Sequence, residues 1–186
     1  MHDINATVIS LAEPERLWSR AECLSRPSTV PAARGLYGWY FKDLPPHVDT
    51  TDCAHRFGCT LLYVGIAPSR PMGNNGLPST SSLRSRIRMH YAGSAEGSTL
   101  RLTIGTLLAA KLTLSRDPAR RSKSFAEGER RLSKWMAENA YVTWVAHDEP
   151  WAIEPQIIAT LNLPFNLAHN RNHAFWAYLR EMRSRS

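Results

Sequence analysis

Six residues of this chain have side chains that could hold an anion and move a proton, and they occur in short stretches separated by long intervals. They are Tyr37, Tyr63, Arg86, His90, Glu154 and Asn166. Each tyrosine lies close to a glycine in an apolar stretch, at residues 35–41 and 60–66. The arginine and the histidine share a basic segment, the glutamate stands in an apolar one, and the asparagine follows it.

One reaction that such groups could serve is phosphodiester hydrolysis. It needs a base for the attacking water, a cation for the developing charge and a Lewis acid on the phosphate. The sequence has no close Asp/Glu cluster and no His-Glu-x-x-His pattern, so it does not predict a two-metal site. Taken singly, the tyrosines could be strand aromatics, and Arg86 and His90 a solvated helix face.

Glu154 has two interpretations. At helical spacing it shares a face with Trp151 and Ile158, and a charge there is costly unless it is paired or bound to a metal. The alternative is a carboxylate at the edge of its helix, near solvent or paired with an arginine.

Composition sets the class of protein. The chain has 186 residues, a formal charge of +7 and a pI near 9.7, which favours one domain with a polyanionic partner, nucleic acid first; a merely basic surface is the alternative. No apolar run is long enough to span a bilayer, and the N-terminus lacks the pattern of a signal peptide. Three cysteines do not make a disulfide framework, so a cytoplasmic location is expected.

The strands and the first long helix position four of the six residues. Residues 35–42 and 60–66 predict an antiparallel hairpin, joined by a polar loop at 43–59 that contains two prolines. A helix starts at Leu83, capped by Ser81 or Ser82, with Arg86 and His90 together on one face. A third strand covers residues 141–146.

The remaining elements complete a single domain over residues 1–186. Residues 1–34 are a lead-in with a short helix at 14–23, and residues 93–140 form a helical insertion before the third strand. Further helices are expected at 98–115, 124–139, 150–161 and, within the C-terminal segment 167–186, at 172–183. The prediction is an α+β fold with a small antiparallel three-stranded sheet flanked by helices.

In combination these stretches resemble the GIY-YIG nucleases. Gly35-Leu36-Tyr37 is similar to the first signature element and Tyr63-Val64-Gly65 to the second. The family's later residues follow in the same order: Arg86 with His90, then Glu154, then Asn166 after Leu163-Pro164-Phe165. The resemblance covers residues 35–91 and 141–166. It implies a metal-dependent endonuclease that hydrolyses DNA and uses one metal ion, Mg²⁺ or Mn²⁺, bound by Glu154.

The resemblance also implies a role for each residue. Tyr37 or Tyr63 would be the general base, and the resemblance leaves open which of the two it is. The neighbours of this tyrosine must stabilise its phenolate, because a free phenol has a pKa near 10. Arg86 would hold the phosphate with its planar fork of donors. His90 would relay a proton or orient the water, and Asn166 would fix the site's geometry.

The chain departs from the pattern in three places. The gap between the tyrosines is long. This gap and the Arg–His pair make the chain more similar to the restriction-enzyme branch of the family than to the repair branch. Ile66 stands where relatives often have lysine, which favours the alternative of a nucleic-acid-binding protein that cuts little or nothing. The insertion at 93–140 is large and carries many basic residues, either a DNA-contacting surface or a solvated face.

Further partners and sites are predicted less specifically. Arg84, Arg88 and Arg101 are candidates for contacts with nucleic acid. A monomer and a homodimer, such as a restriction enzyme would form, both stay open. The loop also contains the zinc-ligand types His47, Cys53, His55 and Cys59, but their spacing fits no common zinc motif, so a plain loop is favoured over a structural zinc.

Overall fold

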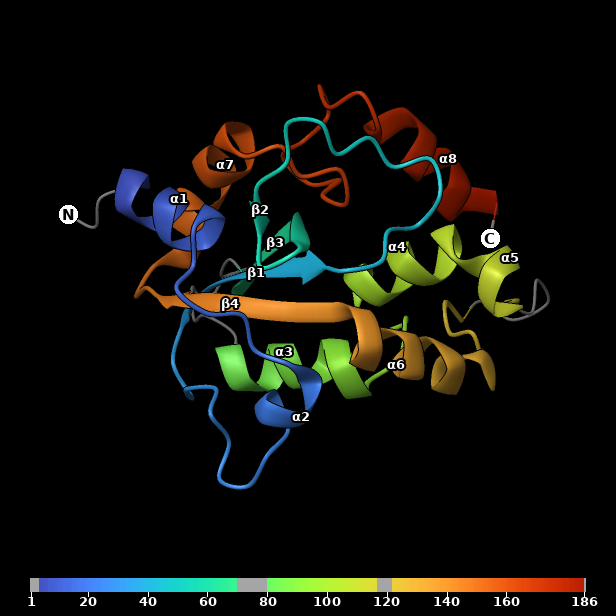
Figure 1. Ribbon diagram of the computed structural model, residues 1–186, viewed down its shortest axis with the longest axis horizontal. Helices are drawn as coiled ribbons and strands as arrows, with labels where there is room; N and C mark the ends of the chain where they lie inside the picture. Colours follow the sequence, from blue (N-terminus) through green and yellow to red (C-terminus); the bar gives the residue numbers. More distant parts are fainter. Residues whose placement is uncertain (1–3, 70–79, 117–121, 186) are drawn as a thin grey trace, which may run out of the picture.

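The computed structural model describes residues 4–69, 80–116 and 122–185, and its centre is an antiparallel sheet in the order β2-β3-β1-β4 (Figure 1). The strands are β1 (Gly35–Phe41), β2 (His55–Arg56), β3 (Cys59–Ala67) and β4 (Ala140–Ala146). The three predicted strands are present and pair antiparallel, so the predicted α+β class is confirmed. The two-residue β2 is an addition, formed where a tight turn at Phe57 and Gly58, both with positive φ, folds part of the predicted 43–59 loop back onto β3.

Helices cover both faces of this sheet. They are α1 (Ile4–Ala12), α2 (Arg20–Cys23), α3 (Leu83–Ala92), α4 (Thr99–Leu107), α5 (Ala109–Leu112), α6 (Gly128–Asn139), α7 (Pro150–Thr160) and α8 (Trp176–Arg185). Figure 1 shows α1 and α7 on one side of the sheet and α2, α3 and α6 on the other. No helix within the described residues has the length and apolar character needed to cross a membrane.

Alternation along β1 builds two separate cores. Tyr37, Trp39 and Phe41 pack into the larger cluster with α3, α4, α6 and α8, while Leu36 and Tyr40 pack into a second cluster with α1 and α7. The central strand is therefore buried along its whole length.

Several predicted helix boundaries were wrong. The helix expected at 98–115 is interrupted at Leu108, whose backbone closes α4, and Thr113 in the left-handed conformation ends α5. The helices expected from 124 and 172 begin later, at Gly128 and Trp176.

The lead-in is more ordered than expected. The helix α1 was not predicted, because several of its residues are β-branched and favour helix only weakly, and it forms by packing Leu11 into the second core. Tyr40 holds its end by donating a hydrogen bond to the Leu11 carbonyl at 2.6 Å. Farther on, Trp18 exchanges two backbone hydrogen bonds with Val142 and so covers the outer edge of β4.

Candidate active site

The first tyrosine and the second glycine fit against each other across the sheet. Tyr37 of β1 and Gly65 of β3 are directly paired residues, and the tyrosine ring lies over the glycine. A Cβ at position 65 would stand 2.6 Å from the Tyr37 hydroxyl oxygen, far inside van der Waals contact. Gly65 is therefore required by the close approach of the ring, and this packing joins the glycine of the second stretch to the tyrosine of the first.

The Tyr37 hydroxyl begins a chain of three buried polar groups. His90 of α3 lies with Nε2 2.9 Å from the Tyr37 hydroxyl, and its Nδ1 lies 2.7 Å from the hydroxyl oxygen of Ser98. That oxygen also accepts the backbone N–H of Arg101 at 3.0 Å and so caps α4. The three side chains have at most 1% exposure, so the chain is closed to bulk water.

His90 is held neutral in this environment. Burial lowers its pKa well below the ordinary value of 6.5, and the charges of Arg86 and Arg101 act in the same direction. A neutral imidazole has one nitrogen that donates and one that accepts. His90 can therefore accept a hydrogen bond from Tyr37 when it donates to Ser98, or the reverse.

The predicted phosphate ligand Arg86 lies beside both tyrosines. Burial raises the pKa of Tyr37, and a charge on Tyr63 would raise it further, but the Arg86 guanidinium opposes this by its charge and by a side-chain hydrogen bond. Helix α3 holds Arg86 here because Ser82 caps its first turn with Ser85 and because Leu83 and Ile87 are buried. The predicted cap and the shared placement of Arg86 and His90 are both confirmed.

Tyr63 lies at the more open side of the site. Its side chain is partly exposed, and its hydroxyl is 3.4 Å from the hydroxyl of Thr99, the first residue of α4. Burial raises its pKa, whereas the Thr99 contact and the charges of Arg86 and Arg183 lower it. Arg183, on α8, was not among the sequence candidates.

Glu154 is a half-buried carboxylate of α7 that faces both tyrosines. Its charge raises the pKa of Tyr37 and of Tyr63, so the carboxylate lies within electrostatic range of both hydroxyls. Burial raises the pKa of Glu154 itself to about 7, with no opposing contribution from a cation. The ion pairs found among residues 4–69, 80–116 and 122–185 do not include it. Pairing with an arginine, one half of the alternative interpretation from sequence, is therefore not found among the described residues, whereas the other half, a carboxylate near solvent, agrees with the partial exposure of Glu154.

Asn166 is buried against the backbone of β3, one residue beyond Tyr63. Its amide oxygen accepts the N–H of Val64 at 3.0 Å, and its amide nitrogen donates to the Val64 carbonyl at 2.8 Å. The amide thus satisfies both backbone groups where β2 no longer pairs with β3. Asn166 fixes the strand that carries Tyr63.

The three arginines proposed from sequence to contact nucleic acid differ in exposure. Arg84 and Arg88 are exposed on α3. Arg101 is fully buried and cannot reach a ligand: its guanidinium pairs with Glu129 at 2.6 Å and donates to the carbonyl of His90 at 3.2 Å. The expectation for Arg101 is therefore corrected to a structural role, which holds the end of α3, and with it His90, against α4 and α6.

The other basic residues of the insertion differ in whether their side chains are free to contact nucleic acid. The exposed ones include Lys123, Arg130, Arg131 and Lys134. The Arg131 guanidinium, however, already donates hydrogen bonds to the carbonyls of Leu112 and Thr113. Arg120 and Arg121 lie outside the described residues.

The zinc-ligand types of the 43–59 loop do not come together. Cys53 is buried in the larger core and Cys59 in the second one, across the sheet. The two nitrogens of His55 contact Thr60 and the carbonyl of Thr50. Within the described ranges no three His, Cys, Asp or Glu side chains are grouped to hold a metal ion.

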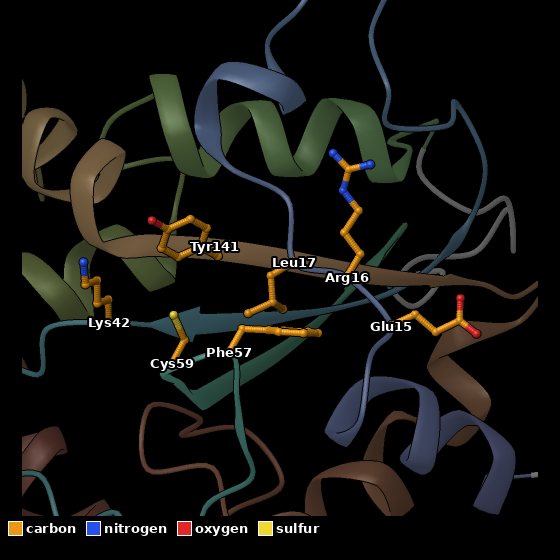
Figure 2. Close-up of a pocket in the computed structure, with 7 residues that line it drawn as sticks. All are labelled: Glu15, Arg16, Leu17, Lys42, Phe57, Cys59 and Tyr141. Atoms are coloured by element: carbon orange, nitrogen blue, oxygen red, sulfur yellow. The ribbon is translucent and has the colours of Figure 1, made fainter.

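A pocket of about 380 Å³ lies away from the six candidate site residues. Figure 2 shows Leu17, Phe57, Cys59 and Tyr141 gathered around it, while the Arg16 guanidinium points away toward its ion pair with Glu22. It contains none of the six candidate residues, so we do not assign the chemistry to it.

Comparison with known proteins identifies the family. The family model of the GIY-YIG catalytic domain matches residues 35–185. The chain belongs to the GIY-YIG family. The match starts with β1 and ends with α8, so the α4–α6 segment lies inside the GIY-YIG domain and residues 1–34 lie before it. Neither the curated proteins nor the solved structures gave a match.

Membership places the chain in a nuclease family, whose enzymes act on DNA and generally depend on a divalent metal ion. The residues present fit such an ion. Glu154 offers hard carboxylate oxygens, is partly exposed, and lacks a compensating cation among the described residues. Mg²⁺ is commonly bound through one or two carboxylates together with water and substrate phosphate, so a single carboxylate is a sufficient protein ligand.

The structure also adds two residues that sequence reasoning missed. Ser98 carried a readable signal, since a serine directly before an apolar helical run is a typical N-cap. Its contact with His90 depends on how α4 packs against α3 and could not be predicted. Arg183 had no signal, because its proximity to Tyr63 arises only when α8 folds back onto α4.

Proposed function

We propose that this protein is a metal-dependent endonuclease that hydrolyses phosphodiester bonds in DNA with one metal ion and a tyrosine general base. The observation that carries the proposal is the Tyr37–His90 contact of 2.9 Å beside Arg86, together with a Glu154 that has no ion-pair partner among the described residues. Together they supply a proton acceptor, a phosphate ligand and a metal ligand in one place.

Tyr37 is the better candidate for the base. A buried phenol does not ionise freely at neutral pH, but Tyr37 need not be ionised if it passes its own proton to His90 while it takes one from water. In this relay the water O–H bond breaks, its oxygen forms a bond to phosphorus, and the Tyr37 proton moves to Nε2 of His90. The ester bond from phosphorus to the leaving oxygen breaks, and that oxygen takes a proton from solvent. His90 must then donate Nδ1–H to Ser98, which has lone pairs to accept it.

Substrate binding would make His90 a better acceptor. Arg86 is one of the two cations that lower its pKa. A phosphate held by the Arg86 guanidinium offsets that charge, so the basicity of His90 rises when the substrate is in place. The tyrosine–histidine relay is therefore strongest in the complex.

The other residues hold the reactants. Glu154 would bind the metal ion, which supplies charge neutralisation at the scissile phosphate when bound. Tyr63, less buried than Tyr37, would donate to a phosphate oxygen or to the attacking water. Asn166 positions Tyr63 through the Val64 backbone.

The second candidate is a nucleic-acid-binding protein that cuts little or nothing. Ile66 favours it, since this residue is buried among apolar side chains and brings no cation to the site. Incubation of plasmid and single-stranded DNA with the protein and Mg²⁺ or Mn²⁺ separates the two functions. Cleavage supports the nuclease; binding without cleavage, across metals and substrates, supports the second candidate.

A further inference from the structure

Two arginines from distant segments meet on the Tyr63 side of the site. Arg183 is in the last turns of α8, and Arg116 follows α5. The Arg116 guanidinium donates to the backbone carbonyl of Arg183 at 3.3 Å, and both side chains are half-buried. The helix that carries Arg183 packs against α4, whose first residue, Thr99, contacts Tyr63.

Neither arginine has a carboxylate partner among the described residues. The ion pairs there join Arg16 with Glu22, Arg101 with Glu129 and Lys111 with Asp43. The Nε of Arg116 is buried and has no hydrogen-bond acceptor within residues 4–69, 80–116 and 122–185. Arg101 shows the contrast, because its buried guanidinium has the carboxylate of Glu129 and several further acceptors.

Two neighbouring cations that are half-buried, with no anion paired with them in the described part of the chain, are unfavourable. Burial lowers the pKa of Arg183 and the charge of Arg116 lowers it further, while a charge on Tyr63 would raise it. An anion between the two guanidinium groups would remove this cost, and the planar fork of arginine suits a phosphate. The arrangement is therefore that of a second anion site.

The surroundings favour a nucleic-acid strand over a free phosphate. On α8, Trp176, Arg180 and Arg183 lie on one face at helical spacing, and the Arg180 guanidinium lies over the Trp176 ring at 5.2 Å. Trp176 and Arg180 line a groove with Arg171 and His169. Aromatic rings interleaved with arginines are typical of surfaces that follow a strand and stack its bases.

We propose that Arg183 and Arg116 bind a phosphate of the DNA strand that flanks the one held by Arg86. This inference rests on the proposed function for the identity of the ligand as DNA. The two arginines are binding residues that set the path of the strand past Tyr63.

The test is the salt dependence of DNA binding without cleavage. Fluorescence anisotropy with a labelled duplex and a labelled single strand, in Ca²⁺, would be measured over a salt series for wild type, Arg183→Gln, Arg116→Gln and Arg26→Gln. Arg26 is an exposed arginine between α2 and β1 and serves as the control. Loss of one phosphate contact lowers the slope of log affinity against log salt by about one. We expect that change in the first two variants, none in Arg26→Gln, and recovery in Arg183→Lys.

Unchanged slopes in Arg183→Gln and Arg116→Gln, with circular dichroism of the folded protein retained, would overturn the inference. A second result would also overturn it. If inorganic phosphate stabilises wild type but not Arg183→Gln, and the salt slope for DNA is the same in both proteins, the site binds free phosphate and not DNA. Cleavage is scored separately. If wild type never cuts DNA but the two variants show the lower slope, the nuclease proposal is refuted and this inference stands. If wild type cuts DNA and the variant slopes are unchanged, this inference is refuted and the nuclease proposal stands.

Discussion

Replacement of Glu154 by glutamine is expected to stabilise the folded chain above neutral pH while it removes metal binding. Burial raises the pKa of Glu154 to about 7 from an ordinary value of 4.5. A difference of about 2.5 corresponds to about 3 kcal/mol at 1.36 kcal/mol per pH unit. Because the folded state holds this proton more tightly than the unfolded state, the carboxylate reduces wild-type stability as the pH rises from 4.5 to 7.

The assay is urea unfolding of wild type and Glu154→Gln in EDTA at pH 5 and pH 8, with Glu138→Gln, an exposed glutamate of α6, as the matched control. At pH 8 the Glu154→Gln variant should be more stable by up to about 3 kcal/mol, and at pH 5 by less than about 1 kcal/mol. Magnesium at ten times its dissociation constant should return about 1.4 kcal/mol to wild type and nothing to the variant.

Equal stability of wild type and Glu154→Gln at pH 8 would refute the reasoning, since the carboxylate would then have a partner that compensates its burial. Stabilisation of both proteins by magnesium would show that the ion binds elsewhere.

Three further predictions concern the supports of the site. Gly65→Ala should cost about 1–3 kcal/mol in urea unfolding and lower cleavage, because its Cβ would overlap the Tyr37 hydroxyl; an unchanged variant would contradict that packing. Ser98→Ala should lose a helix cap worth about 1 kcal/mol and shift the pH–rate profile, with Ser98→Thr restoring both; a shift in stability alone would exclude the relay. Asn166→Ala should cost about 2–4 kcal/mol, measured by thermal unfolding, because two buried backbone groups of Val64 lose their partners; a cost under 1 kcal/mol would mean that water replaces the amide.

Local patterns were sufficient for the strands and the helix that carry most of the site. Residues 35–41 and 60–66 are aromatic and apolar between turn signals, and Ser82 marks the start of α3, so Tyr37, Tyr63, Arg86 and His90 could be placed on elements in advance. The apolar neighbours of Glu154 indicated that its carboxylate would be partly buried, and in the structure burial raises the pKa of this carboxylate.

Long-range packing decided the rest. Arg101 has the same local pattern as an exposed arginine, and only the position of Glu129 on α6 shows that it is buried. The short helix α1 has weak intrinsic preference and forms through its contacts with α7. The charge of Arg183 acts on Tyr63 only because α8 packs against α4. Such contacts between segments far apart in sequence leave no periodic pattern to read.

The most direct test of the central claim is cleavage of a supercoiled plasmid in Mg²⁺ by wild type, Glu154→Ala and Arg86→Ala, with Glu138→Ala and Arg26→Ala as controls. We predict that wild type and both controls nick or linearise the plasmid, that EDTA stops them, and that each site variant is slower by at least about 100-fold. Cleavage at the wild-type rate by both Glu154→Ala and Arg86→Ala would contradict the assignment of this site as the catalytic centre.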